Sequence, residues 1–337
     1  MKKRYGGFVC TFVLLLIATV VFNLSFIAIA NALELKLGHS GSLEHQYHIG
    51  AVQFKKLVEE KSNGEIKVNI FPQGQLGGER DLAEGVRIGT IEIGALAAGN
   101  FGGFVPEVQL FGIPFLFDNR NQVYALLDGA VGNELNQIIG SKGFTNLAYW
   151  EVGFRHLTNN IRPIKTPADV KGLKIRVQES KIWMEFMKAL GAIPTPIPFG
   201  ELYTALQQKV IDGQENPIAS IYSMKFYEVQ KYLSLTAHTY EPALVLANSK
   251  WFNGLSSSHQ QIIREAAAEA AVYQRQFLAN KEKEYLNIMK DAGLVVEENP
   301  DREAFKEATA HLSDVIADMV PPALVQKVRE EAANLKK

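Results

Sequence analysis

Two arginines stand in surroundings that could bind a carboxylate. Arg155 is embedded among aromatic residues in the segment 149–156, and Arg176 lies in the alternating segment 172–177. A guanidinium presents a planar fork of N–H donors that matches a carboxylate bidentately, and it stays charged at neutral pH. Each arginine could equally be a solvated or salt-bridged surface residue. The aromatic neighbours favour a semi-buried position for Arg155, where an unpaired charge would be costly.

A third group of polar residues lies in the segment 201–217. The pattern predicts a short amphipathic helix, a strand, and then a polar turn before Pro217. The turn would present Gln214, Glu215 and Asn216 to a cleft. An ordinary loop with a helix-capping asparagine has the same local pattern, so the residues alone leave both interpretations open.

The common signatures of catalysis are missing from the sequence. G-x-S-x-G, H-E-x-x-H, the P-loop and G-x-G-x-x-G do not occur, and the glycine pairs at 77–78 and 102–103 are typical of turns. His45 and His48 could share a helix face, but two histidines without a third ligand make a weak metal site. We therefore expect a binding protein without a metal ion or cofactor, rather than an enzyme.

The segment that carries Arg176 has clear local signals. Thr166 is an N-cap with Pro167 at the first helical position, and Gly172 closes the turn. Apolar and basic residues then alternate over 173–177, which predicts a strand with one apolar face. Arg176 is thereby turned away from that face, toward solvent or toward a cleft.

The rest of the first half alternates strand and helix patterns. Period-two or short apolar runs predict strands, and apolar residues at helical spacing predict amphipathic helices. The expected strands are 35–38, 66–70, 91–97 and 144–150, and the expected helices are 46–61, 78–88, 120–127 and 130–140. This order predicts an α/β fold.

One segment predicts an unusually long helix. Residues 256–293 contain no internal glycine or proline, open with three serines that could cap a helix, and end on Gly293. Some 33 helical residues would extend roughly 50 Å at about 1.5 Å per residue. A helix of this length favours a bridge across two lobes. The alternative, a coiled-coil dimerisation helix, lacks sustained heptads.

The first 32 residues have the parts of an export signal. Three basic residues at 2–4 precede an apolar stretch at 8–29, and Ala30-Asn31-Ala32 offers small residues for cleavage. The apolar stretch is also long enough to span a bilayer, so an uncleaved anchor is the competing interpretation. We expect cleavage after Ala32 and a periplasmic location, and we exclude residues 1–32 from the fold.

The mature chain is expected to be mildly acidic and free of cysteine. Cys10 is the only cysteine of the 337-residue sequence and lies inside the export signal, so the core must stabilise the fold without disulfides. Removal of residues 1–32 changes the formal net charge from −1 to −4 because three basic residues and no acidic ones are lost. This balance, without a basic block, argues against nucleic acid or anionic lipid as the main partner.

Together these segments resemble a known family, the extracytoplasmic solute receptors of tripartite ATP-independent periplasmic (TRAP) transporters of the dicarboxylate-receptor (DctP) type. The similar stretches run in family order over about residues 35–290 and are highly specific as a set. They are Lys61–Gly64, Phe71-Pro72 with Gln75–Arg80, Pro114–Phe117, Gly153–Arg155, Lys171–Arg176, Leu202–Gln207 and Asp212–Pro217.

The resemblance implies a two-lobed periplasmic-binding-protein fold with hinge strands and a long lobe-bridging helix, which closes on its ligand. The expected division is a signal peptide at 1–32, a lobe I of 33–152 plus 241–280, and a lobe II of 153–240 plus 281–337.

The resemblance also implies roles for individual residues. Arg176 is expected to clamp the ligand carboxylate, Arg155 to be a second polar anchor near the hinge, and Asn216 to contact the carboxylate region. Less specific matches add five further pocket residues to this set. They are His39, Gln46, Asn100, His238 and Tyr240.

Two positions depart from the family pattern. Gln46 stands where the family often has proline, which leaves the loop on the ligand side open. Lys209 replaces a frequent glycine before the segment Asp212–Pro217 and could alter a lobe surface.

The expected function is capture of a small organic acid, a C4-dicarboxylate or a sugar acid, for delivery to the small and large membrane subunits of a TRAP transporter. The receptor is expected to act as a monomer. An alternative is a receptor that presents its ligand to a sensor kinase or an ATP-driven importer. A secreted enzyme would need an activated nucleophile, a metal or an acid–base pair, none of which we find in the sequence.

Overall fold

The structure is a computed structural model that describes residues 32–335. The basic residues at 2–4, the apolar stretch with Cys10, and the first two residues of the expected cleavage site lie outside the described residues. Within 32–335 no helix combines the length and apolar character needed to cross a membrane.

The first half builds the β-α-β-α order that the sequence predicts. Strand β1 pairs in parallel with β3, and β2 lies on the other side of β1. In β2 the side chains of Ile66 and Val68 are buried and those of Lys67 and Asn69 are exposed, as period-two alternation requires. The elements are β1 (Leu33–His39), α2 (Gln46–Lys61), β2 (Ile66–Phe71), α3 (Glu79–Ile88), β3 (Ile93–Ala97) and α4 (Ala98–Phe101).

Strand β4 is much longer than the predicted 144–150. It follows η1 (Pro106–Gly112), α5 (Arg120–Asp128) and α6 (Ala130–Ser141), and it runs over Phe144–Asn159. Its first part pairs with β9 (Tyr240–Asn248), and from Arg155 onward it pairs with β7 and β8. The pairing with β9 shifts register between Glu151 and Gly153. Gly153 has φ +123°, a conformation that side-chain-bearing residues rarely adopt.

A second set of strands surrounds Arg176. Strand β5 lies between β6 and β7 and is parallel to both. The predicted turn before it is confirmed, because Thr166 and Asp169 form a capping box around Pro167. The elements are η2 (Pro167–Val170), β5 (Lys174–Val177), α7 (Lys181–Ala189), β6 (Ile193–Pro196), η3 (Phe199–Glu201), α8 (Leu202–Gln207), β7 (Gly213–Pro217), α9 (Ile218–Ser223), η4 (Phe226–Glu228) and β8 (Tyr232–Ser234).

The expected polar turn at Gln214, Glu215 and Asn216 is wrong, because these residues form the buried strand β7. Strand β7 is antiparallel to β4 and parallel to β5. Local pattern predicts a turn because polar residues rarely occupy a central strand. Here neighbouring strands supply their hydrogen-bond partners, as when the Gln214 amide donates to the Thr158 hydroxyl at 2.8 Å.

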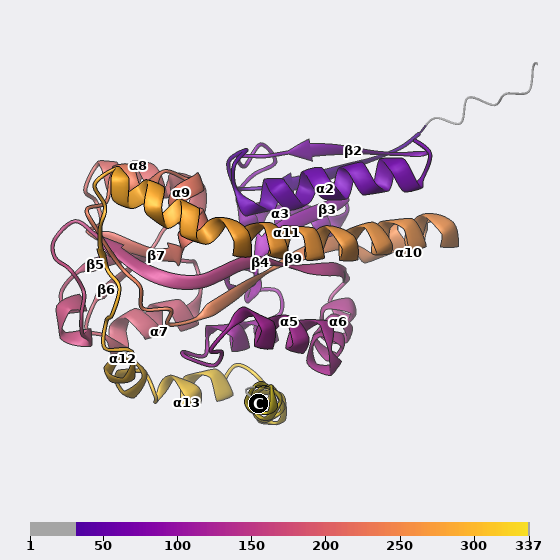
Figure 1. The fold of residues 1–337 in the computed structure, drawn as a ribbon. Helices are drawn as coiled ribbons and strands as arrows, with labels where there is room; N and C mark the ends of the chain where they lie inside the picture. Colours follow the sequence, from indigo (N-terminus) through magenta and orange to yellow (C-terminus); the bar gives the residue numbers. More distant parts are fainter. Residues whose placement is uncertain (1–31, 336–337) are drawn as a thin grey trace, which may run out of the picture. The chain divides into compact units, whose positions relative to one another are not determined.

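The long predicted helix is confirmed as α11, which begins at Ser257 after the N-cap Ser256 and ends at Asp291. It packs along α2 and β4 through one part of its length and against α9 through another. Near its middle the Gln274 amide donates to the backbone oxygen of Glu151 at 2.7 Å. Toward its end Tyr285 stacks on Tyr222 of α9, with 4.1 Å between ring centroids. Figure 1 shows α11 running past both groups of elements.

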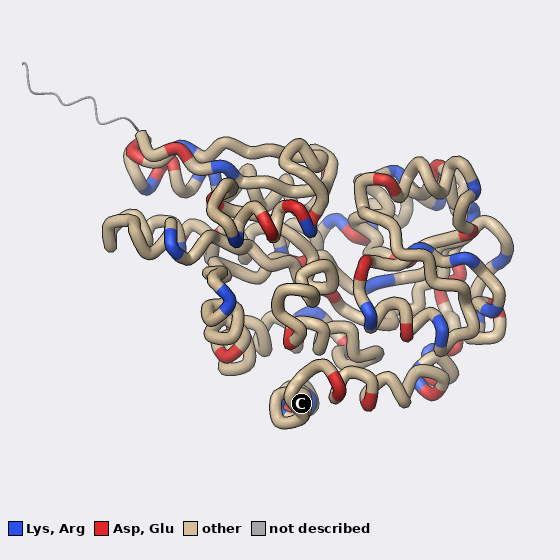
Figure 2. The backbone as a smooth tube through the Cα atoms, turned by 180° about the vertical axis from the view of Figure 1, so that it is seen from behind, with Lys and Arg blue, Asp and Glu red and all other residues tan. Residues whose placement is uncertain are grey.

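The chain closes with short helices that return to both groups. After α10 (Ser249–Asn253) and α11 come β10 (Val295–Glu297), α12 (Arg302–Ala308), α13 (Leu312–Ala317) and α14 (Pro322–Asn334). Helix α13 packs against α7, and α14 packs against α5. Basic and acidic residues are interspersed along the described chain (Figure 2), in keeping with the absence of a basic block in the sequence.

Candidate binding site

A narrow cavity with about 10 Å³ of free volume lies where the two groups of strands meet. Its wall combines the starts of α2 and α3, the end of β3, the middle of β4, and the ends of β5 and β7. This volume is far below the roughly 300–1,000 Å³ of pockets for drug-sized ligands and is close to that of one water molecule, so the two groups of strands would have to separate to admit an organic acid. It is lined by His45, Tyr47, Glu79, Ala97, Asn100, Val152, Arg155, Arg176, Gln178, Phe199, Asn216 and Ser220.

Arg155 is fully buried and its donors are already engaged. The guanidinium forms ion pairs with Glu215 and with Glu241. Nη2 also donates to the backbone oxygen of Glu215 at 2.6 Å and to Oδ1 of Asn216 at 3.1 Å. The ring of Trp183 covers the guanidinium carbon, with 5.1 Å to the ring centroid. Strands β4, β7 and β9 each contribute one charged member of this group, which we call the Arg155 network: Arg155, Glu215 and Glu241.

Opposite charges govern the titration of the Arg155 network. Burial acts to lower the pKa of Arg155, but the charges of Glu215 and Glu241 outweigh it and raise the pKa. Burial raises the pKa of Glu241. At Glu215 burial acts in the same direction, but the charges and hydrogen bonds of Arg155 and His238 together outweigh it and lower the pKa. His238 Nε2 lies 3.4 Å from the Glu215 carboxylate. Burial lowers the pKa of His238, while the neighbouring Glu215 carboxylate acts to raise it.

Arg176 is equally buried but has no acidic partner. Its side chain is 1% exposed, and no carboxylate of the described chain lies within ion-pair distance of it. Nε donates to the backbone oxygen of Ile197 at 2.9 Å, whereas the buried Nη1 has no acceptor. Phe199 faces the guanidinium, with 6.0 Å to the ring centroid. Burial lowers the pKa of Arg176 to about 10.

A buried cation with an empty donor is a strong indicator of an anionic ligand. An unsatisfied buried polar group is costly, and a buried charge without a counterion is more so. Arg176 lines the cavity, and an anion bound there would supply the missing acceptor. A carboxylate can accept two parallel N–H bonds from one edge of a guanidinium in a bidentate pair.

Asn216 and Asn100 also line the cavity, from opposite sides. Nδ2 of Asn216 donates to Oε1 of Gln214 at 2.5 Å while its oxygen accepts from Arg155. Nδ2 of Asn100, in α4, donates to Oε2 of Glu79 at 2.7 Å. The structure therefore brings together four of the eight residues expected at the site: Arg155, Arg176, Asn216 and Asn100.

The other four expected residues lie behind the cavity wall. His39 Nε2 is 3.2 Å from Nδ1 of His48, and Gln46 donates to the Ser220 hydroxyl at 2.7 Å. His238 stacks on Phe186, with 4.8 Å between ring centroids. The described cavity wall does not include these residues.

Tyr240 has a similar place in the hydrophobic core. Its ring packs edge-on against Phe154 and Phe117, with 5.2 Å and 6.4 Å between ring centroids. It precedes Glu241 in β9 and so lies next to the Arg155 network without lining the cavity.

Several lining residues were missed by the sequence analysis. Gln178 follows Arg176 by two residues, so the strand alternation that turned Arg176 off the apolar face could have identified it. Glu79 lies within one of the stretches that carry the resemblance, next to Arg80. Tyr47, Phe199 and Ser220 carry no local signal, because only the packing of distant segments brings them together.

The chain matches the model of one protein family over residues 37–318: "Bacterial extracellular solute-binding protein, family 7". A relative from Escherichia coli K12, the 2,3-diketo-L-gulonate-binding periplasmic protein YiaO, is 40% identical over 97% of this chain and 96% of its own length.

Two solved structures of TRAP periplasmic solute-binding proteins are also similar. The protein from Polaromonas sp. JS666, bound to D-erythronate, is 38% identical with a TM-score of 0.86, over 88% of this chain and 98% of its own. The protein from Sulfurospirillum deleyianum, with bound succinate, is 33% identical with a TM-score of 0.84, over 88% of this chain and 98% of its own.

Proposed function

The chain belongs to family 7 of the bacterial extracellular solute-binding proteins, as a two-lobed receptor of the TRAP type, and on that premise we propose that Arg176 holds the carboxylate of a small organic acid. The observation that carries this assignment is that Arg176 lines the cavity while its buried Nη1 has no acceptor. Similar proteins are named for, or were solved with, 2,3-diketo-L-gulonate, D-erythronate and succinate. Each of these ligands carries a carboxylate, which agrees with the proposed role of Arg176.

Arg155 and Asn216 have a supporting role in this proposal. Two carboxylates and a backbone oxygen already occupy the donors of Arg155, so little of its hydrogen-bonding capacity remains for a ligand. Arg155 in turn donates to Oδ1 of Asn216, which orients that amide at the cavity wall. Asn216 would then contact the carboxylate through the remaining hydrogen of Nδ2, while Arg176 provides the charge.

We further propose that the lobes are residues 33–152 plus 241–280 and residues 153–240 plus 281–337. The change of partners along β4 supports this division, because β4 leaves β9 at Phe154 and joins β7 at Arg155. Helix α14 reaches back to α5 of the first lobe. Closure of the two lobes on the ligand would reduce the radius of gyration in solution scattering, whereas an unchanged profile at saturating ligand would contradict a closing hinge.

Export, cleavage and delivery belong to the same proposal. The signal would be removed after Ala32, and the mature monomer would carry the acid to the small and large membrane subunits of a TRAP transporter. Strand β1 begins at Leu33, so cleavage at this position leaves the fold intact. Mass spectrometry of the exported protein should give a first residue of Leu33. An intact amino terminus in washed membranes would establish the anchor instead.

Calorimetric titration of Arg176 variants tests the carboxylate assignment. A thermal-shift screen of organic acids first selects the tightest ligand for the wild-type protein. Removing one partner of a buried charge pair costs about 2–5 kcal/mol, so Arg176→Ala should weaken binding by roughly 30- to 4,000-fold. Arg176→Lys should also bind poorly, because an ammonium keeps the charge but lacks the planar fork.

A matched control is Arg264→Ala, which removes an exposed arginine from α11. Its affinity should equal that of the wild type. If correctly folded Arg176→Ala binds within about threefold of the wild type, a difference of roughly 0.7 kcal/mol, the carboxylate is held elsewhere.

A further inference from the structure

The charges around the cavity leave room for only one ligand carboxylate. The charged lining residues are Arg155, Arg176 and Glu79. Glu215 and Glu241 do not line the cavity but both pair with Arg155, so two carboxylates face one guanidinium. Of the described residues that line the cavity, Arg176 is therefore the one cation without an acidic partner. A second carboxylate on the ligand would enter a buried space that already holds more acidic than basic groups.

The histidine of the cavity wall does not supply a positive charge that could pair with a second ligand carboxylate. His45 lines the cavity and is 1% exposed. Burial holds its pKa well below the usual range, with a smaller effect from His39. A neutral imidazole can donate one hydrogen bond but does not offset a carboxylate.

Gln178 lines the same cavity and has a buried acceptor without a donor. Its side chain is 4% exposed, and Oε1 is buried without a donor. The amide orientation is set by Glu241, because Nε2 donates to that carboxylate at 2.7 Å and the reverse orientation would place two acceptors together. An ionised carboxylate carries no donor, whereas a ligand hydroxyl can donate to Oε1. Gln178 thus favours a ligand with a hydroxyl group.

Glu79 places a carboxylate in the wall of the same cavity as Arg176. It accepts hydrogen bonds from the Ser40 hydroxyl at 2.8 Å, the backbone N–H of Ala97 at 3.0 Å and the amide of Asn100 at 2.7 Å. All three of these groups donate to the carboxylate oxygens of Glu79. A second anion close to Glu79 would meet like-charge repulsion in a poorly hydrated space.

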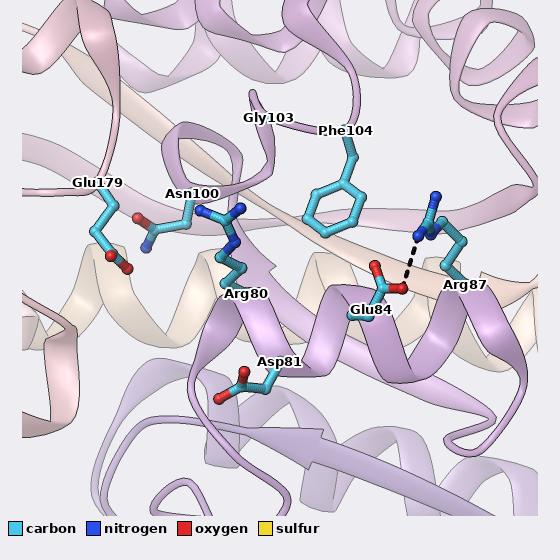
Figure 3. Close-up of a pocket in the computed structure, with 8 residues that line it drawn as sticks. All are labelled: Arg80, Asp81, Glu84, Arg87, Asn100, Gly103, Phe104 and Glu179. Atoms are coloured by element: carbon cyan, nitrogen blue, oxygen red, sulfur yellow. Dashed lines mark hydrogen bonds and ion pairs between the residues drawn. The ribbon is translucent and has the colours of Figure 1, made fainter.

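The next cation, Arg80, lies outside the cavity. It lines a separate groove together with Asn100, Phe104 and Glu179 (Figure 3). Asn100 lines both the groove and the cavity, so it separates Arg80 from the ligand. Arg80 is exposed and is placed to meet solvent rather than a bound acid.

We infer that the cavity selects hydroxylated monocarboxylates over dicarboxylates, with Gln178 accepting from a ligand hydroxyl and Glu79 excluding a second carboxylate. This inference rests on the proposed function, because it takes the carboxylate of the ligand to lie on Arg176. It separates two ligand classes, sugar acids and C4-dicarboxylates, that the arginine alone does not distinguish.

Titration of the wild-type protein with acids of equal carbon number tests the inference directly. The four-carbon pair is D-erythronate and succinate, and the six-carbon pair is D-galactonate and adipate. An unpaired buried acceptor costs about 1–3 kcal/mol, which corresponds to roughly 5- to 150-fold in affinity. We expect the hydroxylated acid of whichever pair binds to be preferred by at least about tenfold. Equal affinity, or a preference for the dicarboxylate, would overturn the inference.

The variant Glu79→Gln tests whether the charge of Glu79 excludes a second ligand carboxylate. A glutamine can keep its oxygen toward Ala97 and Asn100 and turn its amide toward Ser40, so the fold should persist. We expect the preference for the hydroxylated acid to narrow by at least about tenfold, chiefly because the dicarboxylate binds more tightly. The matched control Arg80→Gln changes the adjacent charge in the outer groove and should leave the preference unchanged.

The results separate this inference from the proposed function. If Glu79→Gln weakens both acids in parallel, or if Arg80→Gln abolishes dicarboxylate binding, the role of Glu79 is wrong while capture on Arg176 stands. If Arg176→Ala binds every acid as the wild type does, the proposed function fails and the inference fails with it. Wild-type selectivity remains decisive even if a Glu79 variant does not fold.

Discussion

Arg155 and Arg176 are two buried arginines at the wall of one cavity, and their surroundings differ in almost every respect. Arg155 is ion-paired to Glu215 and Glu241, and these charges raise its pKa. Arg176 has a single backbone acceptor and an empty Nη1, and burial lowers its pKa to about 10. The same side chain therefore serves as part of the scaffold in one place and as a vacant binding group in the other.

This difference shows how to distinguish a buried arginine that binds a ligand from one that stabilises the fold. Burial alone does not separate the two arginines, since their side chains are 0% and 1% exposed. The deciding quantity is how many donors already have acceptors in the ligand-free protein. A paired arginine stabilises the protein without ligand, whereas an unpaired one destabilises it until the ligand arrives.

The largest expected loss of stability comes from a substitution that breaks the Arg155 network. Arg155→Met would leave Glu215 and Glu241 buried beside each other without a cation, and breaking a buried ion pair costs about 3–5 kcal/mol. Urea unfolding of the ligand-free protein should show this loss relative to the wild type, with Arg264→Met as the matched control. A loss below about 1 kcal/mol would show that Arg155 is not a structural support.

The same substitution at Arg176 should have the opposite sign. Arg176→Met removes a buried charge without an acidic partner, and hydrophobic replacements of buried charges are neutral or stabilising by about 1–4 kcal/mol. Urea unfolding without ligand should therefore show equal or greater stability, although binding is lost. A destabilisation like that of Arg155→Met would remove the distinction between the two residues.

A smaller effect is the pH dependence of folding stability that His156, next to the Arg155 network, should produce. His156 neighbours Arg155 in β4, its Nδ1 accepts from the backbone N–H of Ala237, and burial lowers its pKa from 6.5 to about 3. Between about pH 3 and 6.5, His156 is therefore protonated in the unfolded chain but neutral in the folded protein. The stability contribution is complete above about pH 6.5 and declines as the pH falls toward 3.

From pH 7.5 to 5.5 this single histidine should cost about 1.4 kcal/mol of stability. Asparagine can accept from Ala237 without titrating, so His156→Asn should reduce the pH-dependent loss in urea unfolding by that amount. An unaltered pH dependence in the variant would place the titrating group elsewhere.

The smallest expected effect lies far from both arginines, at Lys209. Lys209 is exposed and has φ +58°, where glycine is unstrained, which explains why the family often has glycine there. Lys209→Gly should stabilise the protein by up to about 1 kcal/mol and leave affinity unchanged. Lys142→Gly, at an exposed turn with φ −100°, should not stabilise. Equal responses of the two variants would exclude backbone strain as the cause.

Much of the fold could be predicted because its signals are local. Alternation in 66–70, the capping box at Thr166, and the uninterrupted helical pattern of 256–293 each depend on residues close in sequence. The prediction failed at Gln214, Glu215 and Asn216, where a polar run forms the buried strand β7. The strands that pair with β7 are β4 and β5, and the residues of 213–217 alone do not indicate that pairing.

The candidate site divides in the same way. Strand alternation turned Arg176 off the apolar face, and the same rule extends to Gln178 two residues later. The positions of Tyr47, Phe199 and Ser220 at the cavity depend on how α2, η3 and α9 pack together, so the sequence carried no signal for them.

The sequence by itself determined that the chain alternates strands and helices, that a long helix follows Ser256, and that two arginines are candidates for a carboxylate. Only the tertiary structure decided which arginine is vacant. The partners of Arg155 lie 60 and 86 residues away, at Glu215 and Glu241, and reach it because β7 and β9 flank β4. No carboxylate of the described chain comes within ion-pair distance of Arg176, although the charges of Glu215, Glu79 and Glu241 act on it from farther away. A charge is neutralised by what lies next to it in space, and strand order rather than sequence proximity sets those neighbours.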